Sequence, residues 1–265
     1  MKSPTLNRDG NRRIENGRLV YYHQTADQGY WENVWERELT SDYYKPFQAG
    51  RLYEFERFFK RHLPKDRLIL EAGCGTPQWV VALNTLGYNC VGLDYAITAL
   101  RKARQMAGPL RLVSGDLTAL GMADDSFDAV ISIGVVEHRK EGPEVFLNEM
   151  RRILNPGGLL LISVPYFNPL RRRRADHDAY QDDVTGLDFY QYAFTRTEFC
   201  EILENVGYQI EVVYSYAHQH SLSQELHWLK KIHPFLRRVL LKLSDFIPYV
   251  NTKLGHMLMV VARKK

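Results

Sequence analysis

Two acidic residues and a pair of glycines in the first third of the chain could bind a nucleotide. Glu71 ends the apolar run 68–70, Asp94 ends the apolar run 90–93, and Gly73 and Gly75 lie between them. Glycines let the backbone turn sharply and approach a ligand closely. A carboxylate about 20 residues beyond such a turn can accept both ribose hydroxyls in a nucleotide-binding α/β fold. The pattern predicts a strand, a glycine turn, a helix and a second strand ending at Asp94.

The residues missing from this turn limit which nucleotide it could hold. A dinucleotide fingerprint needs a third glycine where this chain has Gln78, so that a helix N-terminus can face a pyrophosphate. No Lys-Ser/Thr pair follows, which excludes a phosphate-binding Walker loop. Glu71 would repel a phosphate but suits a ligand that carries a cationic amine or sulfonium.

Four stretches between residues 68 and 165 resemble the class I S-adenosylmethionine-dependent methyltransferases. Glu71-Ala-Gly-Cys-Gly-Thr76 is similar to their first motif, E/D-x-G-C-G-T-G, with Pro77 in place of the last glycine. The other three are SGDL at 114–117, DDSFDAVIS at 124–132 and EMRRILNPGGLLLISVP at 149–165. Their agreement in order and spacing supports the resemblance more than any single motif does.

This resemblance implies S-adenosyl-L-methionine as the cofactor. Asp94 would hold the ribose, Asp116 the adenine amino group and Leu117 the ring, while the turn at 133–134 would touch the methionine part. The cofactor-binding residues that we expect on this basis are Glu71, Gly73, Cys74, Gly75, Asp94, Tyr95, Asp116, Leu117, Ile133 and Gly134.

The fold class that follows is α/β, a three-layer Rossmann-like methyltransferase sheet, mostly parallel with an antiparallel last strand. The apolar runs predict strands at 68–70, 90–93, 110–113, 129–133, 159–164, 208–216 and 256–262, with helices at 96–107, 143–154 and 199–206. Thr195 and Glu198 predict a capping box before the last of these helices, and Gly207 its end.

The domain layout that we expect is an N-terminal extension and cap over residues 1–50 and a methyltransferase domain over 51–265. Residues 1–20 are polar and predict partial disorder. The connection 165–195 is long enough to be a lid. A helical insertion over 217–250, divided by Pro234, would lie between the last two strands.

A general base could come from His138, beyond the fourth strand, or from His177 in the connection 165–195, and Glu137 is a further candidate for the catalytic site. His138 lies at the carboxyl end of the sheet, where a neutral imidazole could remove a proton; a structural histidine bonded to backbone is the equal alternative. In quinone-biosynthesis relatives a Glu-His pair at this place helps to bind a metal, and Glu137-His138 resembles it. Gly134 replaces the upstream acidic residue, so we expect no metal. His177 is a second candidate, with a solvated loop as the alternative.

The acceptor-binding residues are expected in two aromatic segments. Tyr30 and Trp31 belong to an N-terminal block whose other aromatics we expect to fill the core, and Tyr166, Arg171 and Tyr192 belong to the connection. The run 171–174 could hold an anionic acceptor, dock on an acidic membrane surface together with the cations of the inserted helices, or be a solvated face. The apolar stripe of the insertion suggests a packed stripe or dimer surface rather than a membrane anchor; it comprises Leu236, Val239, Leu240, Leu243, Phe246 and Ile247.

Composition places few limits on function. The 265 residues are 45% hydrophobic and 25% charged with a net charge of +4, which is ordinary for a globular protein and does not suggest nucleic acid. Three cysteines without metal-type spacing, no secretory signal at the N-terminus and no long apolar stretch favour a cytoplasmic protein.

The function expected from the resemblance is O-methylation of a small-molecule, sugar or lipid-linked acceptor by in-line methyl transfer. Peripheral membrane contact and homodimer formation stay open, and no specific nucleic acid partner is expected. The alternative is a non-catalytic S-adenosylmethionine-binding or scaffold partner, although a scaffold need not keep Glu71, Asp94 and Asp116. An RNA or protein methyltransferase ranks lower, because the fourth strand is followed by Gly134-Val-Val and not by the motif of amino-directed adenine enzymes.

Overall fold

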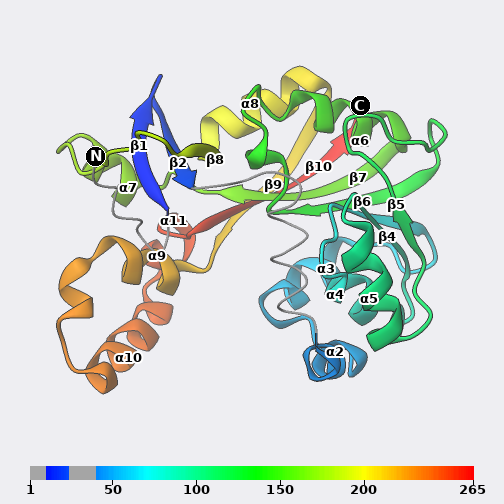
Figure 1. Cartoon of the computed structure of the whole chain (residues 1–265), viewed down its shortest axis with the longest axis horizontal. Coiled ribbons are helices and arrows are strands. Elements are labelled where there is room, and N and C mark those ends of the chain that lie inside the picture. The colour runs from blue at the N-terminus through cyan, green and yellow to red at the C-terminus, as the bar shows by residue number, and fades with distance from the viewer. Residues whose placement is uncertain (1–9, 24–39) are drawn as a thin grey trace.

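A seven-stranded sheet runs through the centre of the molecule in the computed structural model, which describes residues 10–23 and 40–265 (Figure 1). The strand order is β5-β4-β3-β6-β7-β10-β9. All neighbours from β5 to β7 pair in parallel, and β10 pairs antiparallel with both β7 and β9. This confirms the predicted sheet. Its strands are β3 (Leu68–Ala72), β4 (Asn89–Asp94), β5 (Leu112–Ser114), β6 (Phe127–Ile133), β7 (Leu154–Pro165), β9 (Tyr208–Tyr216) and β10 (Met257–Lys264).

Helices cover both faces of this sheet and make three layers (Figure 1). Successive residues of a strand point to opposite faces. Ile69 and Ile131 accordingly join one apolar cluster, and Leu70 and Val130 join the other. The first cluster is closed by α2 (Ser41–Gln48), η1 (Tyr53–Phe55), α3 (Glu56–His62), α4 (Gln78–Thr85) and α5 (Ile97–Ala107), and the second by α6 (Glu144–Ile153) and α8 (Arg196–Val206).

The capping residues of α8 are the predicted ones, although the helix begins at Arg196 rather than at residue 199. The Thr195 side chain accepts a hydrogen bond from the Glu198 backbone, and the Glu198 side chain accepts one from the Thr195 backbone. Gly207 follows in the left-handed conformation, with φ of +99°. Most strand boundaries differ from prediction by one or two residues, and the largest difference is at β7, which begins at Leu154, before a register shift against β6.

A second, three-stranded sheet joins the N-terminal segment to the connection 165–195. A hairpin of β1 (Asn11–Glu15) and β2 (Arg18–His23) pairs through β2 with β8 (Asp188–Ala193), and α7 (Pro169–Ala175) precedes β8 in the connection. The prediction of disorder over residues 1–20 is therefore wrong from residue 11 onwards. Partners about 170 residues away order this polar segment, as when the Asn11 side chain donates to the Asp183 carbonyl at 2.7 Å.

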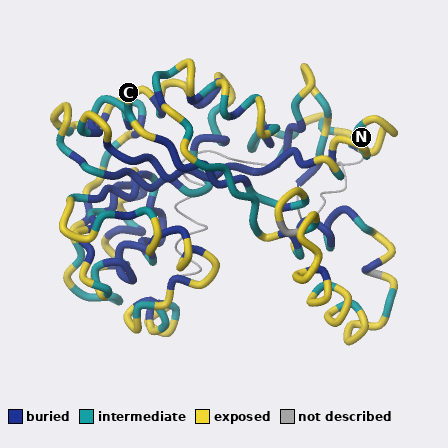
Figure 2. The backbone as a smooth tube through the Cα atoms, turned by 180° about the vertical axis from the view of Figure 1, so that it is seen from behind, coloured by how far each residue is buried: buried dark blue, intermediate teal, exposed yellow. Residues whose placement is uncertain are grey.

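The insertion between β9 and β10 projects from the body of the molecule (Figures 1 and 2). It consists of α9 (His218–Glu225), η3 (His227–Lys230), α10 (Pro234–Leu243), η4 (Ser244–Phe246) and α11 (Pro248–Lys253). Pro234, which we expect to divide the helical insertion, is the first residue of α10. None of the residues of α10 is buried, so the expectation of a packed stripe is wrong. No helix among the described residues is long and apolar enough to span a membrane.

Candidate functional site

The glycine turn after β3 is fixed against the ends of two neighbouring strands. The backbone amides of Gly73 and Cys74 both donate to the Leu93 carbonyl in β4, at 2.8 and 2.9 Å. Gly73 has φ of +77°, and a Cβ there would lie 2.6 Å from the Val135 side chain beyond β6. Only glycine fits both the conformation and the space. Pro77, which departs from the family motif, precedes the first residue of α4.

Asp94 is held at the carboxyl end of β4 by this turn. Its Oδ2 accepts from the Gly75 amide at 2.7 Å and its Oδ1 accepts from the Ala96 amide at 2.9 Å. The Tyr95 backbone also interacts with this carboxylate. A carboxylate has about four lone-pair positions, so Asp94 keeps the capacity to accept from a ligand hydroxyl, such as that of a ribose.

Two buried carboxyl groups give this edge of the sheet an acidic character. Glu71 Oε2 accepts from the Val80 amide at 3.1 Å, and its pKa is raised well above the ordinary value by burial and by nearby Asp94. Burial also raises the pKa of Asp94. Neither carboxyl group forms an ion pair with any cationic side chain in ranges 10–23 and 40–265. A ligand with a positive charge would favour the ionised form of both groups and offset their burial, so the donor set fits S-adenosylmethionine.

The residues expected to hold the purine lie at the next strand end. The Gly115 amide donates to the Asp94 carbonyl at 3.1 Å, which brings the turn after β5 beside the end of β4. In that turn Asp116 is exposed and accepts from the Thr118 amide at 2.7 Å, and Leu117 is buried. Cys74 is buried and Tyr95 is 37% exposed. Their contact with the cofactor stays a prediction.

Glu137 is buried in the turn beyond β6, within η2 (Val136–His138). A Cβ on Gly134 would lie 3.6 Å from Glu137 Oε1, so the carboxyl group lies beside the Ile133–Gly134 backbone. Its Oε2 has no hydrogen-bond partner among the described residues. Burial raises the pKa of Glu137 to about 8, which keeps the group neutral near pH 7. Among all the residues that the structure describes, no group of three His, Cys, Asp or Glu side chains could hold a metal ion.

Replacing Glu137 by Gln should change how stability depends on pH. The native state keeps the proton of Glu137 up to about pH 8, whereas the ordinary value is 4.5. Between these values the unfolded state binds fewer protons, so the free energy of unfolding of the wild type should fall as the pH rises. Glu137→Gln cannot ionise and should lack this fall. Urea unfolding of both proteins across this range measures it; parallel curves for the two would contradict the burial argument.

His138 is held by the connection 165–195. Its Nδ1 lies 2.8 Å from the Tyr190 carbonyl of β8. A carbonyl can only accept, so Nδ1 carries the proton and the lone pair of the neutral ring is on Nε2. Burial lowers the pKa of His138 to about 4, which keeps the imidazole neutral near pH 7. His138 therefore makes the hydrogen bond to the backbone that a structural role would require. Its tautomer is also the one that a general base requires.

The predicted acceptor residues in the connection are only partly brought together. The Tyr192 hydroxyl donates to the Lys140 carbonyl at 2.9 Å, just beyond His138, and Tyr166 is buried at the end of β7. His177 is exposed in the turn after α7, whereas His138 is only partly exposed. Tyr30 and Trp31 lie outside the described residues.

Arg171 corrects the expectation of an acceptor-binding arginine. Its side chain is fully buried, and its Nε donates to Glu225 at 3.1 Å. The other four N–H groups donate to the Tyr166 carbonyl, the His256 carbonyl and Nδ1, and the Gln224 side chain, at 2.6 to 3.3 Å. All five donors of the guanidinium are thereby satisfied inside the protein. Arg171 joins the connection to the insertion and to β10 rather than binding an acceptor.

Two contributors to the site were missed by sequence reasoning. The Tyr43 hydroxyl in α2 lies 3.1 Å from Thr76 Oγ1 in the glycine turn. The many aromatic residues between 21 and 47 indicate such a contact, but nothing in the sequence distinguishes Tyr43 from the others. The Tyr216 hydroxyl in β9 donates to Ser163 Oγ at 3.1 Å, and burial, together with the nearby Glu137, raises the pKa of Tyr216.

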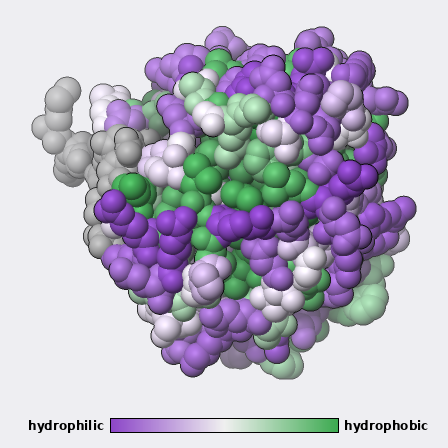
Figure 3. All heavy atoms as spheres, turned by 90° about the vertical axis from the view of Figure 1, so that its right-hand side faces the viewer, coloured by the Kyte–Doolittle hydropathy of each residue, from purple (hydrophilic) through white to green (hydrophobic). Residues whose placement is uncertain are grey.

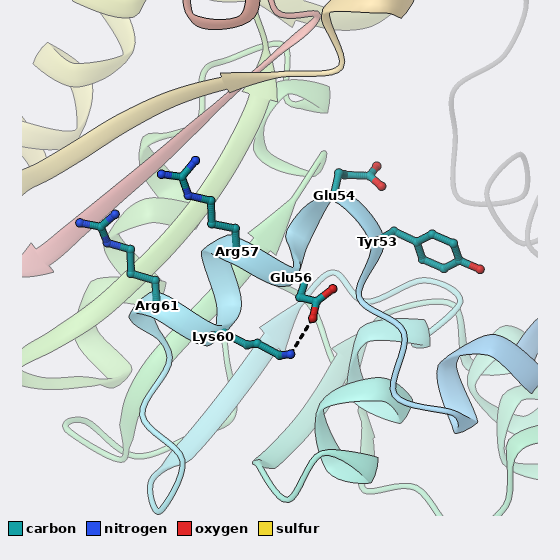
Figure 4. Close-up of a pocket in the computed structure, with 6 residues that line it drawn as sticks. All are labelled: Tyr53, Glu54, Glu56, Arg57, Lys60 and Arg61. Carbon is teal, nitrogen blue, oxygen red and sulfur yellow. Dashed lines mark hydrogen bonds and ion pairs between the residues drawn. The ribbon is translucent and has the colours of Figure 1, made fainter. Parts of the chain in front are cut away.

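A surface hollow elsewhere does not coincide with this site. It lies on the outer side of η1 and α3, where Glu56 and Lys60 form an ion pair at 2.6 Å (Figure 4). It is lined by Tyr53, Glu54, Glu56, Arg57, Lys60 and Arg61. None of the predicted site residues lines this hollow, and its mixed charge indicates a solvated surface.

Comparison with known proteins yields methyltransferases. A family model described as "Methyltransferase domain" matches residues 70–162. A probable S-adenosylmethionine-dependent methyltransferase of Mycolicibacterium smegmatis is 29% identical over 181 residues, 65% of this chain and 66% of the relative. A demethylmenaquinone methyltransferase of Renibacterium salmoninarum is 36% identical over 114 residues, 41% of this chain and 46% of the relative.

Two further similarities include a relative whose name gives a different acceptor. A probable tRNA methyltransferase 9B of Homo sapiens is 33% identical over 129 residues, 48% of this chain but 27% of the relative. A solved S-adenosylmethionine-dependent methyltransferase of Thermotoga maritima aligns with a TM-score of 0.54 at 18% identity, over 89% of this chain and 97% of that one. The chain spans less than two thirds of the length of these three curated relatives, so the similarity concerns the shared domain.

Proposed function

Because the chain belongs to the class I S-adenosylmethionine-dependent methyltransferase family, we propose that it transfers a methyl group to an acceptor hydroxyl. S-adenosyl-L-methionine, the cofactor that this family implies, supplies an activated methyl group on a positively charged sulfur. Glu71, Asp94 and Asp116 bind its polar parts at the strand ends, and the glycine turn lets the backbone come close. The observation that carries the proposal is Asp94, whose oxygens keep acceptor capacity while two backbone amides fix their position.

His138 is the group that would remove the proton from the acceptor. A hydroxyl that attacks a methyl group must lose its proton, and a neutral imidazole with its lone pair on Nε2 can take it. The low pKa of His138 leaves the ring unprotonated near neutral pH. Holding donor and acceptor in line supplies most of the rate, and burial of the site excludes water.

The acceptor that we propose is a small molecule, a sugar or a lipid-linked hydroxyl compound. The name of the Renibacterium salmoninarum relative gives it a quinone precursor as acceptor, which is consistent with a small molecule. The name of the human relative gives it tRNA, which makes RNA methylation the second candidate. A non-catalytic cofactor-binding partner is the third, and binding without any turnover would favour it.

The test combines cofactor binding with a search for the acceptor. Calorimetric titration with S-adenosylmethionine should show one site per chain. The protein is then incubated with the cofactor and with separate pools of sugars, lipid extract, phenols and tRNA, and mass spectrometry detects the gain of one methyl group. A methylated hydroxyl compound is the expected product; methylated tRNA would replace the proposal by the second candidate, and absence of cofactor binding would refute it.

A further inference from the structure

The insertion carries an apolar face that the protein does not cover. Phe235, Leu236 and Leu243 of α10 are 69%, 48% and 55% exposed. At about 100° per residue, five apolar residues of α10 occupy an arc of about 140° on one side of the helix, and Leu241 lies outside it; the five are Phe235, Leu236, Val239, Leu240 and Leu243. Phe246 and Ile247 continue this face past the end of α10, and Phe246 is 83% exposed, the highest value among the large apolar side chains described. Figure 2 shows this segment exposed along most of its length.

Cations flank this apolar face on both sides. Arg237 lies beyond one border of the arc, and Arg238 and Lys242 lie beyond the other, by the same helical spacing. Between Lys231 and Lys253 the chain has five Lys or Arg residues and one carboxylate, Asp245. Asp245 already accepts from His218 and Gln219 at 3.0 and 2.8 Å, and no ion pair joins Arg237, Arg238 or Lys242 to a described carboxylate.

We propose that α10 and the following residues to Tyr249 form a docking surface for an anionic lipid bilayer. Apolar side chains with flanking cations are typical of helices that lie in the membrane interface, where the cations reach lipid phosphates. A second copy of the chain would bring like charges together on this face. A nucleic acid would use the cations but would leave the large apolar side chains in water. The charge pattern and the apolar arc together therefore favour lipid.

The docking surface is fixed to the body of the protein, so docking would also set the orientation of the candidate site. The insertion is anchored next to β9 and β10 by the buried Arg171–Glu225 ion pair, at 3.1 Å. A docked α10 would therefore hold the sheet in a fixed relation to the lipid surface. This inference rests on the exposure and charge of the insertion and holds whatever acceptor is methylated.

Flotation with vesicles tests the proposal. Full-length protein is mixed with vesicles of phosphatidylcholine alone or of equimolar phosphatidylcholine and phosphatidylglycerol. We expect binding to the anionic vesicles, weakened by salt. Phe235→Ser with Phe246→Ser should lower the partition coefficient roughly tenfold or more. Arg238→Gln with Lys242→Gln should lower it by about fivefold for each cation removed.

The controls use exposed residues outside the insertion. Val113→Ser with Val145→Ser removes exposed apolar side chains from β5 and α6, on the body of the protein. The face at the β5 edge also carries apolar surface framed by hydrophilic side chains (Figure 3). Arg57→Gln with Arg61→Gln removes two cations from the hollow on α3 (Figure 4). Both controls should bind vesicles like the wild type.

Three results would overturn the proposal. The first is absence of binding to anionic vesicles. The second is a wild-type dimer that the Phe235 and Phe246 substitutions turn into a monomer, because the face would then be an interface between copies. The third is binding to the tRNA pool that the cation substitutions abolish and the phenylalanine substitutions leave unchanged. Circular dichroism confirms that each variant is folded.

Discussion

Asp94→Ala should raise the dissociation constant for S-adenosylmethionine on the order of a hundredfold or more. The carboxylate is proposed to accept both ribose hydroxyls, and hydrogen bonds to a charged group contribute about 1.5–3 kcal/mol each. The fold should persist, because Asp94 lies at the end of β4 rather than within an apolar cluster. Some stability should be lost, since the amides of Gly75 and Ala96 lose their acceptor. Calorimetric titration measures the affinity and thermal unfolding measures the stability.

A matched variant separates the loss of the ligand contact from a general loosening of the sheet. Asp128→Asn, in β6, also removes a charge that accepts a backbone hydrogen bond, from Leu68 at 3.0 Å, but lies at the opposite ends of the strands. It should bind the cofactor like the wild type. A folded Asp94→Ala protein with wild-type affinity would show that the ribose assignment is wrong.

Most of the large sheet could be predicted because its signals are local. Each buried parallel strand is a short apolar run, and the capping box and Gly207 mark the ends of α8 within the sequence itself. The carboxylates at the ends of β3 and β4 could be placed for the same reason. A strand that ends in an acidic residue needs no knowledge of distant partners to indicate a ligand site at that edge.

The place of the β1–β2 hairpin in the second sheet could not be predicted, because its neighbours in the sheet and in hydrogen bonds lie in the connection 165–195. The hairpin itself has a local signal that the prediction of disorder overlooked: Asn16 and Gly17 both have positive φ and form the two-residue turn between Glu15 and Arg18. Arg171 shows the same limit: a run of four arginines suggests a solvated surface, yet the first of them meets Glu225, which is 54 residues away. The His138 partner is a backbone carbonyl, which any residue at position 190 would supply.

The apolar stripe of α10 illustrates a different limit. A helical period of apolar residues indicates which side of a helix avoids water, but not what covers that side. Of the two expected arrangements, the packed stripe is excluded because α10 has no buried residue, and the dimer surface stays a prediction. Only the three-dimensional arrangement, with the insertion projecting from the sheet, reveals that the stripe is exposed (Figure 1).

His138→Ala should lower kcat by about 10² to 10⁴ on the acceptor that the mass-spectrometric search identifies, because that range is typical of a lost general base. The affinity for S-adenosylmethionine should stay within about twofold, since the cofactor-binding carboxylates are untouched. Because the pKa of His138 is about 4, protonation of the base should reduce kcat only near that pH and not near the ordinary value of 6.5. The pH dependence of kcat in the wild type measures this.

His138→Asn distinguishes the base from the structural alternative. The Asn amide nitrogen is attached to Cγ, like Nδ1 of His138, so it can still donate to the Tyr190 carbonyl and should keep the packing of β8 on η2, but it cannot take a proton. If His138 is the base, this variant should be as stable as the wild type and as slow as His138→Ala. Recovery of turnover in His138→Asn would assign His138 a structural role, because only the hydrogen bond to β8 would then matter.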